Sequence, residues 1–93
     1  MIKTFRGKHT EKIFLREPVS QFSQVVCRNA LRKLLVLDAA ERLDDLRMPP
    51  GNQLEKLVGD RQGQYSIRIN DQWRICFRWK DGDALDVEVV EYH

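Results

Sequence analysis

The chain has 93 residues, of which 42% are hydrophobic and 32% charged, and these values fit a single folded domain spanning residues 1–93. Sixteen basic and fourteen acidic residues give a formal net charge of +2, which excludes nucleic-acid binding through bulk charge alone. No apolar run approaches the ~18–20 residues of a membrane helix, and the first residues lack a secretory signal. The sequence therefore predicts a cytoplasmic protein without a membrane partner.

The cysteine pattern does not indicate a metal site. Cys27 and Cys76 are the only cysteines, and neither CxxC spacing nor a histidine at zinc-site distance accompanies them. We expect both to be reduced, half-buried thiols, because a cytoplasmic compartment disfavours disulfides.

The residue pattern of the first half of the chain predicts helices. Residues 10–15 fit a short helix that ends before Pro18, and Ser20 is expected to cap a longer second helix. Apolar residues then recur at three- and four-residue steps and form one face, namely Phe22, Val25, Val26, Ala30, Leu31, Leu34, Leu35 and Leu37. One or two further turns are expected before the proline pair at 49–50.

After that pair the hydrophobic period changes from about 3.6 to 2, which indicates strands. Apolar and polar residues alternate in three segments, 65–70, 73–80 and 85–90. Turn residues at 70–72 and 81–83 predict an antiparallel meander, with edge strands at 2–5 and, more weakly, at 54–57. The expected fold class is α+β, with N-terminal helices packed on one face of an antiparallel β-sheet.

Charge pairing favours one register for the last hairpin. A three-residue loop at 81–83 places Arg78 opposite Asp86 and Cys76 opposite Glu88, with apolar residues paired on the other side. A two-residue loop would instead place Arg78 opposite Leu85. We expect the three-residue loop.

The preceding hairpin predicts an arginine cluster on the open side of the sheet. Its register places Arg68 opposite Arg74, and Arg78 projects from the same side. Such a like-charged pair is tolerated when a carboxylate or a ligand phosphate lies between the guanidinium groups, and arginine binds phosphate well. Two interpretations remain open: ordinary solvated strand residues balanced by nearby acids, or a phosphate site.

The chain closes on Glu91, Tyr92 and His93. A terminal histidine is often only a surface residue. A tyrosine and a histidine beside two arginines are nevertheless sufficient for acid–base chemistry without a metal.

Several segments resemble the HigB branch of the RelE-like toxins, and within it the GraT-like plasmid-maintenance killer proteins. The similar segments are MIKTF at 1–5, LRMPPGNQLE at 46–55, GDRQG at 59–63, SIRINDQWRI at 66–75 and EYH at 91–93. The likeness spans essentially the whole chain, and NDQWR and the terminal EYH are its most specific parts.

The resemblance implies a RelE-like fold and a toxin of a type II toxin–antitoxin system. Such toxins are endoribonucleases that cut messenger RNA in the ribosomal A site by attack of the ribose 2′-hydroxyl, without a metal or another cofactor. The implied partners are the 70S ribosome with its mRNA, and a HigA-like helix-turn-helix antitoxin through which alone the protein would reach operator DNA.

The resemblance also implies residue roles. Arg74 would stabilise the developing phosphorane charge, while Tyr92 and His93 would orient the nucleotide or move protons. The candidate catalytic residues are Arg74, Tyr92, His93, Glu55 and Glu91, and the candidate RNA- or phosphate-binding residues are Arg68, Arg61, Lys56 and Arg78.

One departure from the family pattern leaves the general base open. Many members carry a histidine and a lysine just before the GDR loop, where this chain has Glu55 and Val58. Three outcomes remain open: Glu55 takes the proton, His93 takes it alone, or turnover is slow. Glu55 also fits an ordinary strand carboxylate. The alternative function is a RelE-like module that binds the ribosome or a partner without cutting.

Overall fold

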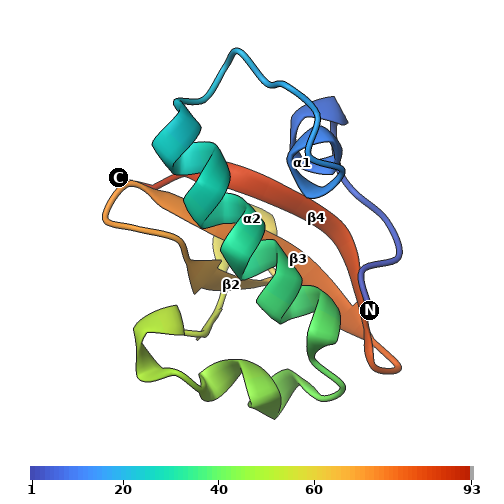
Figure 1. The fold of residues 1–93 in the computed structure, drawn as a ribbon. Helices are drawn as coiled ribbons and strands as arrows, with labels where there is room; N and C mark the ends of the chain where they lie inside the picture. The colour runs from blue at the N-terminus through green and yellow to red at the C-terminus, as the bar shows by residue number, and fades with distance from the viewer. Residues whose placement is uncertain (93) are drawn as a thin grey trace.

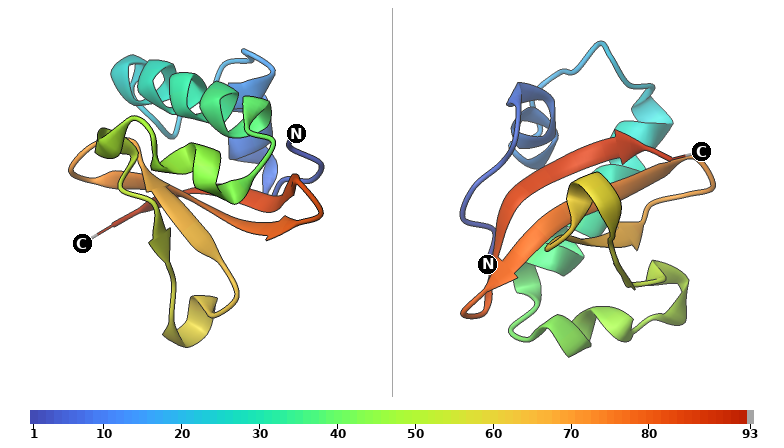
Figure 2. Two further views of the ribbon diagram at one scale, coloured as in Figure 1. Left: turned by 90° about the horizontal axis from the view of Figure 1, so that it is seen from below. Right: turned by 180° about the vertical axis from the view of Figure 1, so that it is seen from behind.

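The computed structural model describes residues 1–92 and confirms the α+β class (Figure 1). The helical half consists of α1 (Lys8–Phe14), α2 (Gln24–Ala39) and the short 3-10 helices η1 (Leu43–Arg47) and η2 (Pro50–Asn52). The second half consists of β1 (Glu55–Lys56), the 3-10 helix η3 (Gly59–Arg61), β2 (Tyr65–Arg68), β3 (Trp73–Lys80) and β4 (Asp83–Glu91). Figure 2 shows α1 and α2 on one side of the sheet and η3 on the other.

The strands form one antiparallel sheet in the order β1-β2-β3-β4, so the expected meander is confirmed. The N-terminal segment makes only isolated parallel bridges to β4, from Ile2 to Ala84 and from Phe5 to Val87. These contacts cover the outer edge of β4, which would otherwise expose unpaired backbone groups.

The turn between β3 and β4 differs from the expectation. Lys80 lies opposite Asp83, so the loop contains only Asp81 and Gly82, with φ of 52° and 83°. Positive φ at both central residues defines the type I′ turn that an Asp-Gly pair favours in two-residue hairpins. The three-residue loop is therefore wrong, and Arg78 lies opposite Leu85.

A β-bulge then restores the rest of the expected register. The pairing shifts by one residue between Arg78 and Cys76, so Cys76 lies opposite Glu88 as expected. Asp86 adopts a φ of 52° at the bulge, and its Oδ2 lies 3.4 Å from Arg78 Nε. The bulge thus preserves the Arg78–Asp86 ion pair although the two residues are not directly opposite.

The second helix begins later than expected. Ser23, not Ser20, caps α2, and its Oγ accepts a hydrogen bond from the Val26 backbone N at 3.1 Å. The preceding Phe22 packs edge-on against Trp73 of β3, with ring centroids 5.0 Å apart. Phe22 therefore precedes the helix and packs against the sheet instead.

The core lies between α2 and the helix-facing side of the sheet. Its largest fully buried apolar side chains are Leu34, Leu37, Leu46, Ile67, Ile75, Phe77 and Val87. Two residues assigned to the apolar face of the helix are exposed instead, Val25 at 55% and Leu35 at 41%. Within residues 1–92, no helix has the length and apolar character needed to cross a membrane.

We expect Leu34→Ala to destabilise the protein by ~2–5 kcal/mol, because it leaves a cavity in the core. Leu35→Ala removes the same atoms from an exposed position and should cost ~0.5 kcal/mol or less. Urea denaturation of the two variants and the parent measures the difference. Equal losses would contradict this orientation of α2.

Candidate functional site

Arg74 is the central cation of the sheet face that points away from α2. Its side chain is only 6% exposed, so the interpretation as an ordinary solvated strand residue does not hold for Arg74. Nε donates to Ser66 Oγ at 2.8 Å, and Nη2 donates to the backbone oxygens of Gln53 at 2.5 Å and Ser66 at 3.4 Å. These acceptors compensate much of the cost of burying the guanidinium and fix its orientation.

Two other predicted residues lie against Arg74. The Tyr92 ring stacks on the guanidinium, with Arg74 Cζ 5.3 Å from the ring centroid. Glu55 Oε2 lies 3.9 Å from Arg74 Nη2. The Tyr92 backbone N donates to the Gln72 oxygen at 2.6 Å, which anchors the end of the chain beside β3. A cation, a phenol and a carboxylate are thus brought together.

Of these three residues, Glu55 and Tyr92 line a groove of about 310 Å³, and the buried Arg74 lies behind them without lining it. Its lining residues are Glu55, Lys56, Leu57, Val58, Asp60, Arg61 and Tyr92. Four candidate residues therefore line one groove, namely Glu55, Lys56, Arg61 and Tyr92, as does Val58. Asp60 was not singled out in the sequence, although it lies within the GDRQG segment.

A second, more polar hollow of about 350 Å³ adjoins the groove and is lined by Arg6, Asp60, Arg61, Gln64 and Glu88. Asp60 and Arg61 belong to both. No sequence spacing indicates Arg6 here, because it comes from the opposite end of the chain. Its backbone N donates to the Val87 oxygen at 3.0 Å, which holds it beside β4.

The remaining two candidate arginines have carboxylate partners of their own. Arg68 lies opposite Arg74 as expected, but its guanidinium forms an ion pair with Asp71. Arg78 pairs with Asp86. The strand arginines are therefore bound to separate acceptors and do not share a single anion.

Glu91 and His93 are the last two candidate residues. Glu91 lies opposite Trp73, on the helix-facing side of the sheet by register, and its Oε2 accepts from Gln72 Nε2 at 2.5 Å. The structure therefore does not bring Glu91 into the groove. His93 lies outside the described residues.

Cys76 lies on the same sheet face and is fully buried. Burial raises the pKa of the Cys76 thiol; the Arg61 guanidinium opposes this shift and the Glu88 carboxylate adds to it. Among residues 1–92, no group of three or more His, Cys, Asp and Glu side chains is arranged to hold a metal ion.

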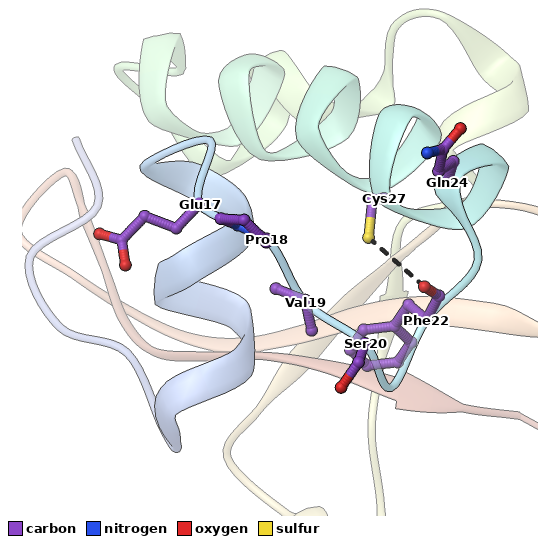
Figure 3. Close-up of a pocket in the computed structure, with 7 residues that line it drawn as sticks. All are labelled: Glu17, Pro18, Val19, Ser20, Phe22, Gln24 and Cys27. Carbon is purple, nitrogen blue, oxygen red and sulfur yellow. Dashed lines mark hydrogen bonds between the residues drawn. The ribbon is translucent and has the colours of Figure 1, made fainter.

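Cys27 lies on the helical side and lines a pocket of about 340 Å³ (Figure 3). The other lining residues are Glu17, Pro18, Val19, Ser20, Phe22 and Gln24. The pocket lies between the α1–α2 connection and the first turn of α2. Cys27 Sγ is 4.0 Å from the Phe22 oxygen.

The groove and the adjacent Arg74 bring together groups that could serve acid–base chemistry on an anionic substrate. Guanidinium groups stabilise negative charge, and a carboxylate or a phenol can transfer a proton. Because the partners of Arg74 hold it in place, its charge is preorganised.

Two solved structures have a fold similar to that of this chain. Two YoeB–YefM toxin–antitoxin complexes from Staphylococcus aureus match with TM-scores of 0.58 and 0.62, covering 100% of this chain and 98% of the matched chain. Sequence identities of 17% and 18% mean that this likeness shows the fold alone. The expected RelE-like fold is confirmed.

The sequence comparisons identify the protein family to which the chain belongs. The model of the RelE-like toxin of the type II toxin–antitoxin system HigB matches residues 3–93. Toxin HigB-1 of Vibrio cholerae is 42% identical over 87 residues, 92% of each chain, and Endoribonuclease HigB of Proteus vulgaris is 30% identical over 93 residues, 100% of each. The chain belongs to the HigB-like toxin family.

The two thiols should differ in reactivity. We expect Cys27 to react with Ellman's reagent in the native protein, because it lines an open pocket. Cys76 should react only on unfolding, because it is buried and its raised pKa lowers the thiolate fraction. Cys27→Ser should remove the fast reaction and Cys76→Ser should retain it. Fast reaction of Cys76 would contradict its burial.

Proposed function

We propose that this protein is the toxin of a type II toxin–antitoxin pair and cuts messenger RNA in the ribosomal A site without a metal. The observation that carries the proposal is the Tyr92 ring stacked on the buried Arg74 guanidinium, with Glu55 beside them, at a groove also lined by Lys56 and Arg61. The Proteus vulgaris relative named an endoribonuclease supports the reaction class. The site of action would be the cytoplasm, where ribosomes are.

In the proposed reaction the ribose 2′-oxygen attacks the adjacent phosphorus and the bond from phosphorus to the 5′-oxygen breaks. The products are a 2′,3′-cyclic phosphate and a 5′-hydroxyl. A base removes the 2′-hydroxyl proton, and an acid protonates the departing 5′-oxygen. Arg74 stabilises the additional negative charge on the phosphorane.

The other candidates take supporting roles in this proposal. Tyr92 stacks on or orients a nucleotide, and Lys56 and Arg61 contact the RNA backbone beside it. Glu55 is exposed by 47% in its side chain and borders the groove, so it is the described candidate for the base; His93 is the other candidate. Arg68 and Arg78 would contact phosphates further along the sheet face.

Primer extension on a translated message with ribosomes tests the function. We expect in-frame cuts by the parent and a loss of ~10²-fold or more in Arg74→Ala, since a preorganised donor at a developing charge is removed. Because Arg74 is buried, Tyr92→Ala and Lys56→Ala are the companion variants: both side chains are exposed, and both changes should weaken cleavage while the fold is retained.

Lys12→Ala on α1 is the matched control for Lys56→Ala and should cut like the parent, and deletion of His93 tests the terminal histidine. Cosedimentation with ribosomes without any cut would favour the non-cleaving binder. Equal cutting of naked RNA would contradict the dependence on ribosomes.

For the antitoxin, we propose a HigA-like helix-turn-helix protein that docks on the helical side and alone contacts operator DNA. Both solved neighbours are toxin–antitoxin complexes. The exposed side of α2 carries the apolar Val25 and Leu35 together with Arg28 and Arg32, and α1 is followed by the exposed Leu15. This surface and the pocket of Figure 3 lie on the side of the sheet away from η3, which leaves the groove accessible.

Co-expression with the helix-turn-helix protein encoded beside the toxin, followed by co-purification, tests this partner. Val25→Glu and Leu35→Glu should abolish co-purification, because each places a charge in an apolar contact. Lys56→Glu, in the groove, should retain it. The opposite pattern would place the antitoxin on the groove instead.

A further inference from the structure

Every candidate arginine on the open face has a carboxylate partner within the chain. Among residues 1–92 the four pairs are Arg61–Glu88, Arg68–Asp71, Arg74–Glu55 and Arg78–Asp86. An incoming phosphate must therefore displace or share an internal anion at each of these cations.

The Arg61–Glu88 pair differs from the other three. Both side chains are at most 35% exposed, Arg61 at 35% and Glu88 at 30%, whereas each other pair has a partner exposed by 47% or more. Partial burial reduces screening by water and salt. Glu88 is the least exposed of the four carboxylates, so water and salt screen its competition with an external anion least.

Both terminal nitrogens of the Arg61 guanidinium already have acceptors within the chain. Nη1 and Nη2 both lie near Glu88 Oε1, at 3.4 Å and 3.3 Å, and Nη1 also lies 3.2 Å from Gln64 Oε1. A phosphate binds arginine best through two parallel N–H groups. Such binding at these two nitrogens requires Arg61 to leave Glu88.

Arg61 also lies where the groove meets the second hollow, which contains Arg6. An RNA backbone that passes from the groove into this hollow would run beside Arg61 and meet Arg6 next. Glu88 lines the hollow and faces the same path.

We propose that Glu88 is a specificity-determining residue that holds Arg61 in an internal ion pair, so that the free protein binds RNA weakly and only RNA presented by the ribosome displaces the carboxylate. This inference rests on the proposed function. It further assigns the hollow lined by Arg6 and Arg61 as a second RNA backbone subsite. If Glu88 only positioned Arg61 for RNA binding, neutralising Glu88 would weaken RNA binding instead of strengthening it.

The test measures binding of a fluorescent, single-stranded 2′-O-methyl RNA without ribosomes. This RNA has no free 2′-hydroxyl, so binding is read without cleavage. The variants are Glu88→Gln, Arg61→Gln, the double variant, and Asp44→Asn. Glutamine retains the shape and the acceptor oxygen of Glu88. Asp44→Asn neutralises another arginine–carboxylate pair, Asp44–Arg47, whose residues line neither the groove nor the hollow.

We expect Glu88→Gln to bind about three- to ten-fold more tightly than the parent, since one competing charge is removed. The slope of log affinity against log salt should steepen by about 0.7, the value for one more phosphate contact on a single strand. The double variant should bind no more tightly than Arg61→Gln alone. Asp44→Asn should stay within about two-fold of the parent, because salt screens distant charges.

Equal or weaker binding by Glu88→Gln overturns the inference, as does the absence of measurable binding by every variant. A gain that persists without Arg61 also overturns it, because that gain would reflect net charge. If the parent cuts on ribosomes while Glu88→Gln has unchanged RNA affinity, only this inference fails. If nothing cuts on ribosomes, the proposed nuclease function fails instead, whatever the affinities are.

Discussion

The site depends on how one buried guanidinium is compensated. A charge taken out of water is costly unless hydrogen bonds and an opposite charge replace its hydration. Arg74 obtains these from Ser66 Oγ at 2.8 Å on the neighbouring strand and from the Gln53 oxygen at 2.5 Å before β1, with Glu55 at 3.9 Å. These partners come from two segments, residues 53–55 and β2, so burying the Arg74 side chain on β3 ties three parts of the chain together.

The consequence for the groove is geometric. Gln53 has a left-handed φ of 45° at the end of η2. Its backbone oxygen accepts a hydrogen bond from Arg74, and this contact fixes where β1 begins. That position sets the wall formed by Glu55 and Lys56. Tyr92 covers the guanidinium from the other end of the chain, so the two sides of the groove share Arg74 as their common contact.

The sequence allowed the alternating strands, the meander and the opposition of Arg68 and Arg74 to be predicted, because a period of two specifies faces directly. It did not allow the burial of Arg74 to be predicted, since the backbone oxygen that accepts from it belongs to Gln53, which no strand pairing places beside Arg74. The loop of the last hairpin differs from the prediction for a local reason. Charge pairing predicts the pairing of Cys76 with Glu88 correctly, but it does not predict the bulge at Asp86. This bulge allows a two-residue Asp-Gly turn to be combined with that pairing. Glu91 is the last residue of β4 and lies opposite Trp73, so it does not share the face of Arg74.

Internal ion pairs explain how an arginine-bearing face can avoid general polyanion binding. Opposite charges a few Å apart largely cancel at separations near the Debye length of ~10 Å, so long-range steering of RNA is weak. At contact distance a bidentate phosphate can still compete for a guanidinium, because such pairs are strong and directional. A face built from paired arginines therefore favours an anion that is already held in place over one captured from solution. Under the proposed function the ribosome holds the message, so the toxin needs only short-range complementarity, and a formal net charge of +2 is sufficient.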